Sequence, residues 1–157
     1  MAIHLDAIDL KILNILQEKG KITNVQLSQE VGLSPAPTLE RVKKLENSGV
    51  IKSYHAQIDK TRVGLGFTAL IQLSLTRQKD NAMRNFVAAI NKIPEITECL
   101  QLTGSFDYQL RVVVRDIPAF ERLIADKLSR IEEIGQMQTV VVLSEVKSGR
   151  SLPIRTE

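Results

Sequence analysis

The stretch from residue 24 to residue 47, NVQLSQEVGLSPAPTLERVKKLEN, constrains the fold of this chain more than any other. It predicts two short helices joined at Gly32, because glycine takes the left-handed conformation that ends a helix without a steric penalty. Ser34 is a good N-cap for the second helix, and Pro35 and Pro37 fall in its first turn, where backbone amides lack intrahelical partners. Two helices joined in this way are the helix-turn-helix pattern, whose second helix enters the DNA major groove.

The two predicted helices have an inner and an outer side. The inner side is expected to bury the apolar residues Val25, Leu27, Val31, Leu33, Leu39, Val42 and Leu45. The leading end and the basic outer side of the second helix then predict DNA contacts from Ser34, Ala36, Pro37, Thr38, Arg41, Lys43 and Lys44. The alternative is an ordinary helical hairpin with a solvated charged face. The rigid Ser-Pro-x-Pro start favours DNA binding, because a pre-formed helix N-terminus suits phosphate oxygens.

Helix signals also flank this stretch. A first helix is predicted over residues 6–19, with Asp6 as its N-cap and a broad face of isoleucine and leucine side chains. Thr23 is expected to cap the second helix, and Gly49 to close the third. Three helices with a helix-turn-helix in the last two predict a trihelical or winged domain over residues 1–50.

The chain then changes character. Residues 51–59 alternate weakly and predict a strand that serves as a short wing or a connector. Residues 60–66, KTRVGLG, contain two glycines and show no period, which indicates a hinge. We therefore expect a helix-turn-helix domain, a strand-and-hinge linker and a C-terminal domain, over residues 1–50, 51–66 and 67–157.

Beyond the hinge, strand and helix periods follow one another. Four strands are predicted, over residues 67–76, 96–103, 108–115 and 137–145. Two helices separate them, over residues 80–93 and from Asp116 to a closing Gly135. The order strand-helix-strand, strand-helix-strand predicts an α+β fold of the ferredoxin-like βαββαβ type.

Two helices cover only one face of such a sheet. The other face would still carry the apolar side chains of Val113, Val140 and Val142. An uncovered apolar face implies a partner, and a back-to-back homodimer is the simplest closure, because one patch then serves both subunits.

The chemical inventory argues against catalysis. The two histidines, His4 and His55, lie far apart in the sequence and do not combine with the single cysteine, Cys99, in metal-ligand spacing. We expect Cys99 to be a small core residue, and no metal or other cofactor. No signal peptide and no apolar run of about 18 residues is present, so a cytoplasmic protein without membrane contact is expected. The net charge of +3 does not by itself single out a nucleic-acid domain.

One polar turn stands out between the second and third predicted strands of the C-terminal domain. Its backbone amides and Asp107 are suited to hold the two charged ends of a small zwitterion. The predicted effector contacts are Gln101, Thr103, Gly104, Ser105, Phe106, Asp107 and Tyr108. The alternative is a plain hairpin turn, for which Gly and Asp are standard residues.

Several motifs together resemble one family over nearly the whole chain. They are Leu5-Asp6-x-x-Asp9-x-x-Ile12-Leu13, Asn24-Val25-x-Leu27-Ser28, Val31-Gly32-Leu33-Ser34-Pro35, Glu40-Arg41-Val42, Gly49-Val50-Ile51, Thr103-Gly104-x-x-Asp107-Tyr108 and Val140-Val141-Val142-x-x-Glu145. The chain resembles the Lrp/AsnC family of leucine- and asparagine-responsive regulators. The resemblance implies an N-terminal domain for double-stranded DNA and a C-terminal amino-acid-binding (RAM) domain. It also implies dimers that assemble into octamers, with a free amino acid as effector between RAM domains.

Two residues depart from the family's pattern, Gln101 and Ser105, and they favour an effector with a polar or adaptable side chain. The leading hypothesis is a transcription regulator of the Lrp/AsnC type and not an enzyme. The alternative is an enzyme of similar fold, such as a haem-biosynthesis decarboxylase, although the C-terminal domain offers no histidine for its cleft. A stand-alone effector-binding module is a third possibility, against which the helix-turn-helix argues.

Overall fold

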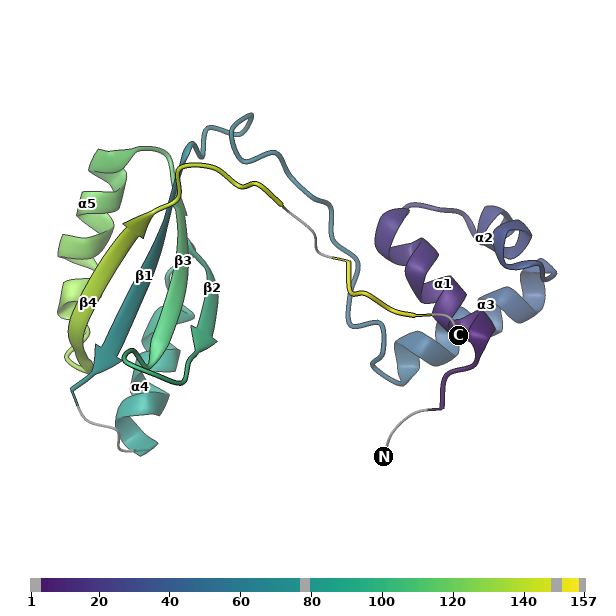
Figure 1. Ribbon diagram of the computed structural model, residues 1–157, viewed down its shortest axis with the longest axis horizontal. Helices are drawn as coiled ribbons and strands as arrows, with labels where there is room; N and C mark the ends of the chain where they lie inside the picture. The colour runs from purple at the N-terminus through teal and green to yellow at the C-terminus, as the bar shows by residue number, and fades with distance from the viewer. Residues whose placement is uncertain (1–3, 77–79, 148–150, 156–157) are drawn as a thin grey trace. The chain divides into compact units, whose positions relative to one another are not determined.

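The computed structural model describes residues 4–76, 80–147 and 151–155 (Figure 1). It divides into two compact units, Met1–Gln57 together with Lys147–Glu157, and Ile58–Val146. The first is the helical unit and the second the sheet unit. The division differs from the expected boundaries at the C-terminus. Residues 151–155 bind the first helix of the helical unit through backbone hydrogen bonds of Leu152 and Ile154, and the Ile154 side chain packs on its core.

Local signals at the helix ends explain the helical unit. Its helices are α1 (Ala7–Glu18), α2 (Asn24–Val31) and α3 (Pro35–Asn47). Asp6 and Thr23 each cap a helix through a reciprocal capping box, as their side chains predict. Gly32 ends α2 with φ +79°, the left-handed conformation that glycine adopts most readily.

The N-cap of α3 is Ser34, as predicted, but its side chain makes no capping hydrogen bond. Its carbonyl instead accepts a hydrogen bond of 2.9 Å from the hydroxyl of Thr38. Pro35 occupies the first position of the helix and Pro37 the third, so neither removes an intrahelical hydrogen bond.

The core of the helical unit differs from the predicted inner side at two positions. Val25 and Leu39 are exposed, at 55% and 41%. Successive steps of three residues rotate by 300°, so Leu39 and Leu45 point about 120° apart, and only one can face the core. Thr38 takes the buried place on α3. Its hydroxyl donates a hydrogen bond to the Ser34 carbonyl, which offsets the free-energy cost of burying a polar group. The buried apolar residues are Ile12, Leu13, Leu27, Val31 and Leu45.

The segment from residue 51 to residue 59 forms no strand, contrary to the sequence-based expectation. Tyr54 and Ile58 are exposed. Apolar and polar residues alternate too weakly in this segment to give a strand with one buried face. The turn that follows is closed by hydrogen bonds from the Gly64 amide to the Thr61 carbonyl and from the Leu65 amide to the Lys60 carbonyl.

The sheet unit is the predicted βαββαβ fold. Its elements are β1 (Phe67–Leu75), α4 (Asp80–Ile90), β2 (Ile96–Gln101), β3 (Tyr108–Val114), α5 (Ile117–Asp126), the 3-10 turn η1 (Leu128–Arg130) and β4 (Ile134–Val141). The strand order is β2-β3-β1-β4, and each neighbouring pair is antiparallel. Helices α4 and α5 cover one face of the sheet (Figure 1), where Phe86, Ile90 and Leu123 pack on the apolar side chains of β1 and β3.

The second helix of this unit is shorter than predicted. It ends at Asp126, and the chain turns through η1 before β4 begins at Ile134. Gly135 therefore lies in β4 and is not a helix cap. Its backbone runs so close to β1 that an added Cβ would lie 3.3 Å from the Ser74 carbonyl oxygen, which explains a glycine within a strand.

Cys99 is exposed and is not the core residue that was expected. It lies opposite Leu110 on β2, one of the two edge strands, which has a neighbouring strand on one side only. Partial burial nevertheless raises the pKa of the Cys99 thiol, because the charged thiolate is disfavoured there.

The face of the sheet away from the helices is open in the single chain. Val140 lies opposite Leu70, and Val113 opposite Thr68, so their side chains share this face. Val140 is 45% exposed. Gln72, Gln109, Arg111 and Gln138 lie on the same face, and Val113 is half-buried, so the face is of mixed polar and apolar character and is less apolar than the strand pattern predicted.

Candidate nucleic-acid interface and effector turn

The leading end of α3 is held by α2 and open to solvent. The Asn24 side-chain amide donates a hydrogen bond of 2.8 Å to the carbonyl of Pro35, which ties the two helices at the turn. Ser34, Ala36 and Pro37 are exposed there, and Lys43 and Lys44 are exposed further along the helix. Five of the seven predicted DNA contacts are thus free of the core.

Arg41 does not face outward as predicted. One of its guanidinium nitrogens, Nη1, lies 2.7 Å from Asp6 Oδ2 and 2.7 Å from Asp9 Oδ1, both at the start of α1. The same two aspartates form the capping box of α1, so one cluster caps that helix and joins it to α3. Asp9 is only 2% exposed, so its charge depends on this partner.

The opposite charges in this cluster stabilise one another. The hydrogen bond from the Asp9 amide, followed by that from Arg41, holds the pKa of the Asp6 carboxyl below its ordinary value. In turn, the hydrogen bonds to Asp6 and then to Asp9 raise the pKa of the Arg41 guanidinium. Two aspartates three residues apart at a helix start were visible in the sequence, but nothing in the pattern identified a partner 32 residues further on.

The predicted effector turn lies at one end of the sheet, between β2 and β3. Gln101, Thr103, Gly104 and Ser105 are exposed, and Phe106 is half-buried. Gly104 has φ +127°, and an added Cβ would meet no atom within 4 Å, so glycine serves the backbone conformation there and not a tight contact.

Asp107 anchors this turn to the neighbouring strand. Its Oδ2 accepts a hydrogen bond of 2.8 Å from the Leu75 amide, and its own amide donates one of 2.9 Å to the Leu73 carbonyl. Ser74 adds a hydrogen bond from its hydroxyl to the carbonyl of Ser105. The carboxylate therefore has a structural role in the single chain, in addition to any role toward a ligand.

Tyr108 belongs to the core beneath the turn. It is 4% exposed, and its ring lies 4.7 Å from that of Phe86, centroid to centroid. Burial, together with the nearby Cys99 and Asp107, raises the pKa of its hydroxyl. Its position suits support of the turn better than direct contact with a ligand.

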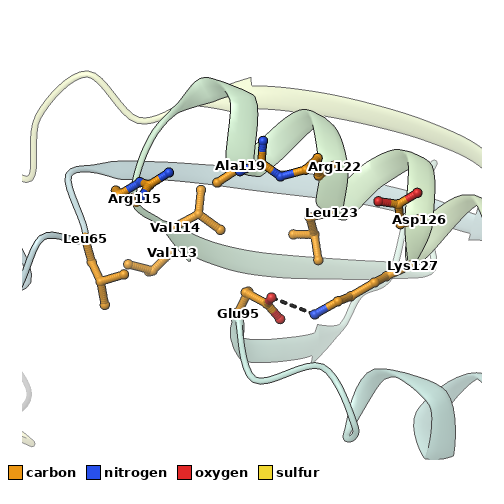
Figure 2. A pocket seen from close by; sticks show the side chains of 10 residues that line it. All are labelled: Leu65, Glu95, Val113, Val114, Arg115, Ala119, Arg122, Leu123, Asp126 and Lys127. Carbon is orange, nitrogen blue, oxygen red and sulfur yellow. Dashed lines mark hydrogen bonds and ion pairs between the residues drawn. The ribbon is translucent and has the colours of Figure 1, made fainter.

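A cavity of about 380 Å³ lies elsewhere in the sheet unit, between α5 and the end of β3 (Figure 2). Lys127 Nζ lies 2.6 Å from Glu95 Oε1 at its edge, and this contact holds the pKa of Glu95 below its ordinary value. None of the predicted effector residues lines the cavity. Its lining consists of Leu65, Glu95, Val113, Val114, Arg115, Ala119, Arg122, Leu123, Asp126 and Lys127.

Other classes of site gain no support from the described residues. In residues 4–76, 80–147 and 151–155, no group of three or more His, Cys, Asp or Glu side chains is placed to hold a metal ion. No helix in these ranges has the length and apolar character needed to cross a membrane.

A helix-turn-helix with an exposed leading end, joined to a ferredoxin-like α+β unit, defines a two-domain DNA-binding regulator. Comparison with family models agrees in both halves. Residues 5–52 match a winged helix-turn-helix DNA-binding model, and residues 68–152 match the Lrp/AsnC ligand-binding domain. The chain belongs to the Lrp/AsnC family.

Individual relatives agree over nearly the full chain. The leucine-responsive regulatory protein of Haemophilus influenzae is 42% identical over 151 residues, 96% of this chain and 91% of the relative. That of Escherichia coli K12 is 40% identical over 97% of this chain and 93% of its own length. These relatives are regulators, which favours regulation over the haem-decarboxylase alternative.

Solved structures give the same assignment. A transcriptional regulator from Neisseria meningitidis, solved as a complex with L-Met, is 41% identical and superposes with a TM-score of 0.91 over 96% of this chain and 97% of that one. The AsnC structure from E. coli gives a TM-score of 0.86 at 25% identity, over 96% of this chain and 99% of that one.

From the Asp6–Arg41 contact we predict how the free energy of unfolding of the helical unit changes at acidic pH. Because the pKa of Asp6 is lowered on folding, its contribution to stability is complete above the unfolded-state pKa and is lost as the pH falls through the folded-state pKa. The unfolding free energies of wild type and Asp6→Asn should differ by a constant amount at neutral pH. The difference should shrink below about pH 5.

Chemical denaturation monitored by circular dichroism across pH 2–7 measures this difference. Glu18→Gln, an exposed substitution on the same helix, is the control and should follow the wild type throughout. A pH-independent gap between wild type and Asp6→Asn would contradict the assigned role of the ion pair.

Proposed function

We propose that the chain regulates transcription by inserting α3 into the DNA major groove, and that it responds to a free amino acid bound by the sheet unit. The observation that carries the first part is the exposed leading end of α3, held rigid by its prolines and by the cluster at Arg41. Family membership supports both parts. A protein with this role acts in the cytoplasm, where its single cysteine stays reduced.

The DNA contacts are divided by position. Ser34, Ala36 and Pro37 are placed to meet base edges or phosphates at the helix N-terminus. Lys43 and Lys44 are placed to meet phosphates. Thr38 and Arg41 hold the helix in place, since one is buried and the other is neutralised by two carboxylates.

Loss of a single phosphate contact gives a specific signature. Lys44→Ala should weaken binding to the chain's own upstream DNA and reduce the slope of log affinity against log salt by about 1, because fewer counterions are released. Fluorescence anisotropy at several salt concentrations measures both quantities. Lys92→Ala, an exposed lysine in the sheet unit, is the matched control. If both variants keep the wild-type slope, α3 does not lie along the DNA as proposed.

The open face of the sheet supports a homodimer. Its β-branched side chains are arranged on one surface, and a twofold axis allows the same surface to close both subunits. Dimers of this kind would assemble further into octamers, and their operators would be pseudo-palindromes with half-sites related by whole helical turns.

A charge on the open face should break the dimer. Val140→Asp should shift the protein to monomers in sedimentation velocity, because an unpaired buried charge costs several kcal/mol. Val87→Asp places the same charge on α4, at a valine of similar exposure, and should leave the dimer intact. A wild-type monomer at micromolar concentration, or an intact Val140→Asp dimer, would contradict the proposal.

We place the amino acid at the turn of residues 101–108. Exposed amides around Gly104 suit the α-carboxylate of the ligand, and the Asp107 carboxylate suits its α-ammonium. The remaining contacts come from Gln101, Thr103, Ser105 and Phe106, with Tyr108 as support beneath. The turn is open in the single chain, so a second dimer would complete the pocket. A relative solved with L-Met supports an amino acid as the ligand class.

Asp107→Asn is the sharpest test, because asparagine keeps an oxygen for the Leu75 amide but loses the charge. At 100 times its dissociation constant, an amino acid should add about 2.7 kcal/mol of stability to the wild type. Thermal-shift measurements with the twenty amino acids should show that gain, and Asp107→Asn should abolish it while still binding DNA. An unchanged shift in Asp107→Asn would remove the turn from the ligand site.

A further inference from the structure

The C-terminal segment, residues 151–155, is bound to α1 by its backbone. The Leu152 amide donates a hydrogen bond of 2.6 Å to Gln17 Oε1, and Gln17 Nε2 donates one of 3.3 Å to the Leu152 carbonyl. Asn14 Nδ2 donates a further one of 3.2 Å to the carbonyl of Ile154. Two side-chain amides, three residues apart on one face of α1, therefore bind the segment at two points.

Packing reinforces these hydrogen bonds. Ile154 is half-buried against the core of the helical unit, while Pro153 restricts the backbone between the two bound residues. The Ile154 amide also donates a hydrogen bond of 2.8 Å to the Leu152 carbonyl, which tightens the turn. Hydrogen bonds and one half-buried side chain therefore attach residues 151–155 to the helical unit.

The attachment gives the sheet unit two connections to the helical unit. One enters β1 at Phe67, and the other leaves β4 after Val141. These strands are antiparallel neighbours with Ala69 opposite Val141, so both connections start from the same end of the sheet. Lys60 joins them, because its Nζ lies 3.0 Å from the Thr68 hydroxyl and 3.6 Å from Glu145 Oε2.

We propose that the docked C-terminal segment is the second link through which the sheet unit controls the DNA-binding helices. A displacement transmitted along the connection from β4 would act on α1 at Gln17 and Asn14. From α1 it reaches α3 through the ion pairs of Asp9 and Asp6 with Arg41. This inference rests on the proposed effector response of the sheet unit.

Coupling between the effector site and the DNA-binding site requires that the ligand stabilise one arrangement of the chain more than another. Two sites are coupled only if some contact is compatible with one global arrangement and not with the other. A single flexible connection allows many arrangements of the two units, whereas a second, anchored connection restricts them. Removal of the anchor should therefore leave each binding site intact and abolish the coupling between them.

The experiment measures the operator affinity of the full-length protein by fluorescence anisotropy, with and without saturating L-methionine or L-leucine. In the wild type, the amino acid should change the dissociation constant by about fivefold or more. In Gln17→Ala, and in a chain that ends at residue 150, the change should fall to within about twofold. Both variants should retain the wild-type thermal shift with the same amino acid. Gln29→Ala, an exposed glutamine on α2, is the matched control and should respond as the wild type does.

The outcomes separate this inference from the proposed function. If the wild type responds and both variants respond equally, the docked segment carries no signal and the inference is overturned, while the effector role of the sheet unit stands. If neither these two nor any other of the twenty amino acids shifts the wild type thermally or changes its operator affinity, the proposed effector response and the inference both fail. Gln17→Ala keeps the test decisive if truncation impairs folding.

Discussion

The helical unit depends on the contact of one guanidinium with two carboxylates. Arg41 on α3 bridges Asp6 and Asp9 at the start of α1, while the same carboxylates cap that helix. Because Asp9 is buried, leaving its charge unpaired would cost several kcal/mol. The rotation of α3 about its own axis is thereby fixed, and with it the side that carries Ser34, Ala36 and Lys44 into solvent.

A different constraint governs the sheet unit: its sheet has two faces, but its two helices cover only one of them. Helices α4 and α5 cover the side that carries Ile71 and Leu110, and the other side remains open. Open strands and an open turn at their end leave the unit incomplete as a single chain. A second subunit can cover the open face of the sheet, and a ligand can bind at the turn. The proposed regulation depends on these two interactions.

Much of the fold could be predicted because its signals are local. Capping residues such as Asp6 and Thr23, the left-handed Gly32 and the strand periods each report on a few neighbouring residues. The errors had two different sources. Leu39 is exposed because Thr38 fills its place in the core, and the predicted strand over residues 51–59 lacks a pairing surface.

The candidate site divides in the same way. The sequence by itself determined the helix-turn-helix, the order of the sheet elements and the polar turn, since each is encoded by spacing along a short stretch. Only the tertiary structure decided that Arg41 binds α1, that Asp107 ties its turn to Leu75 and that the C-terminal segment docks on Gln17. Those contacts join residues 32 to 135 positions apart, and the energy that selects one pairing of charges or amides over another exists only once the chain has folded.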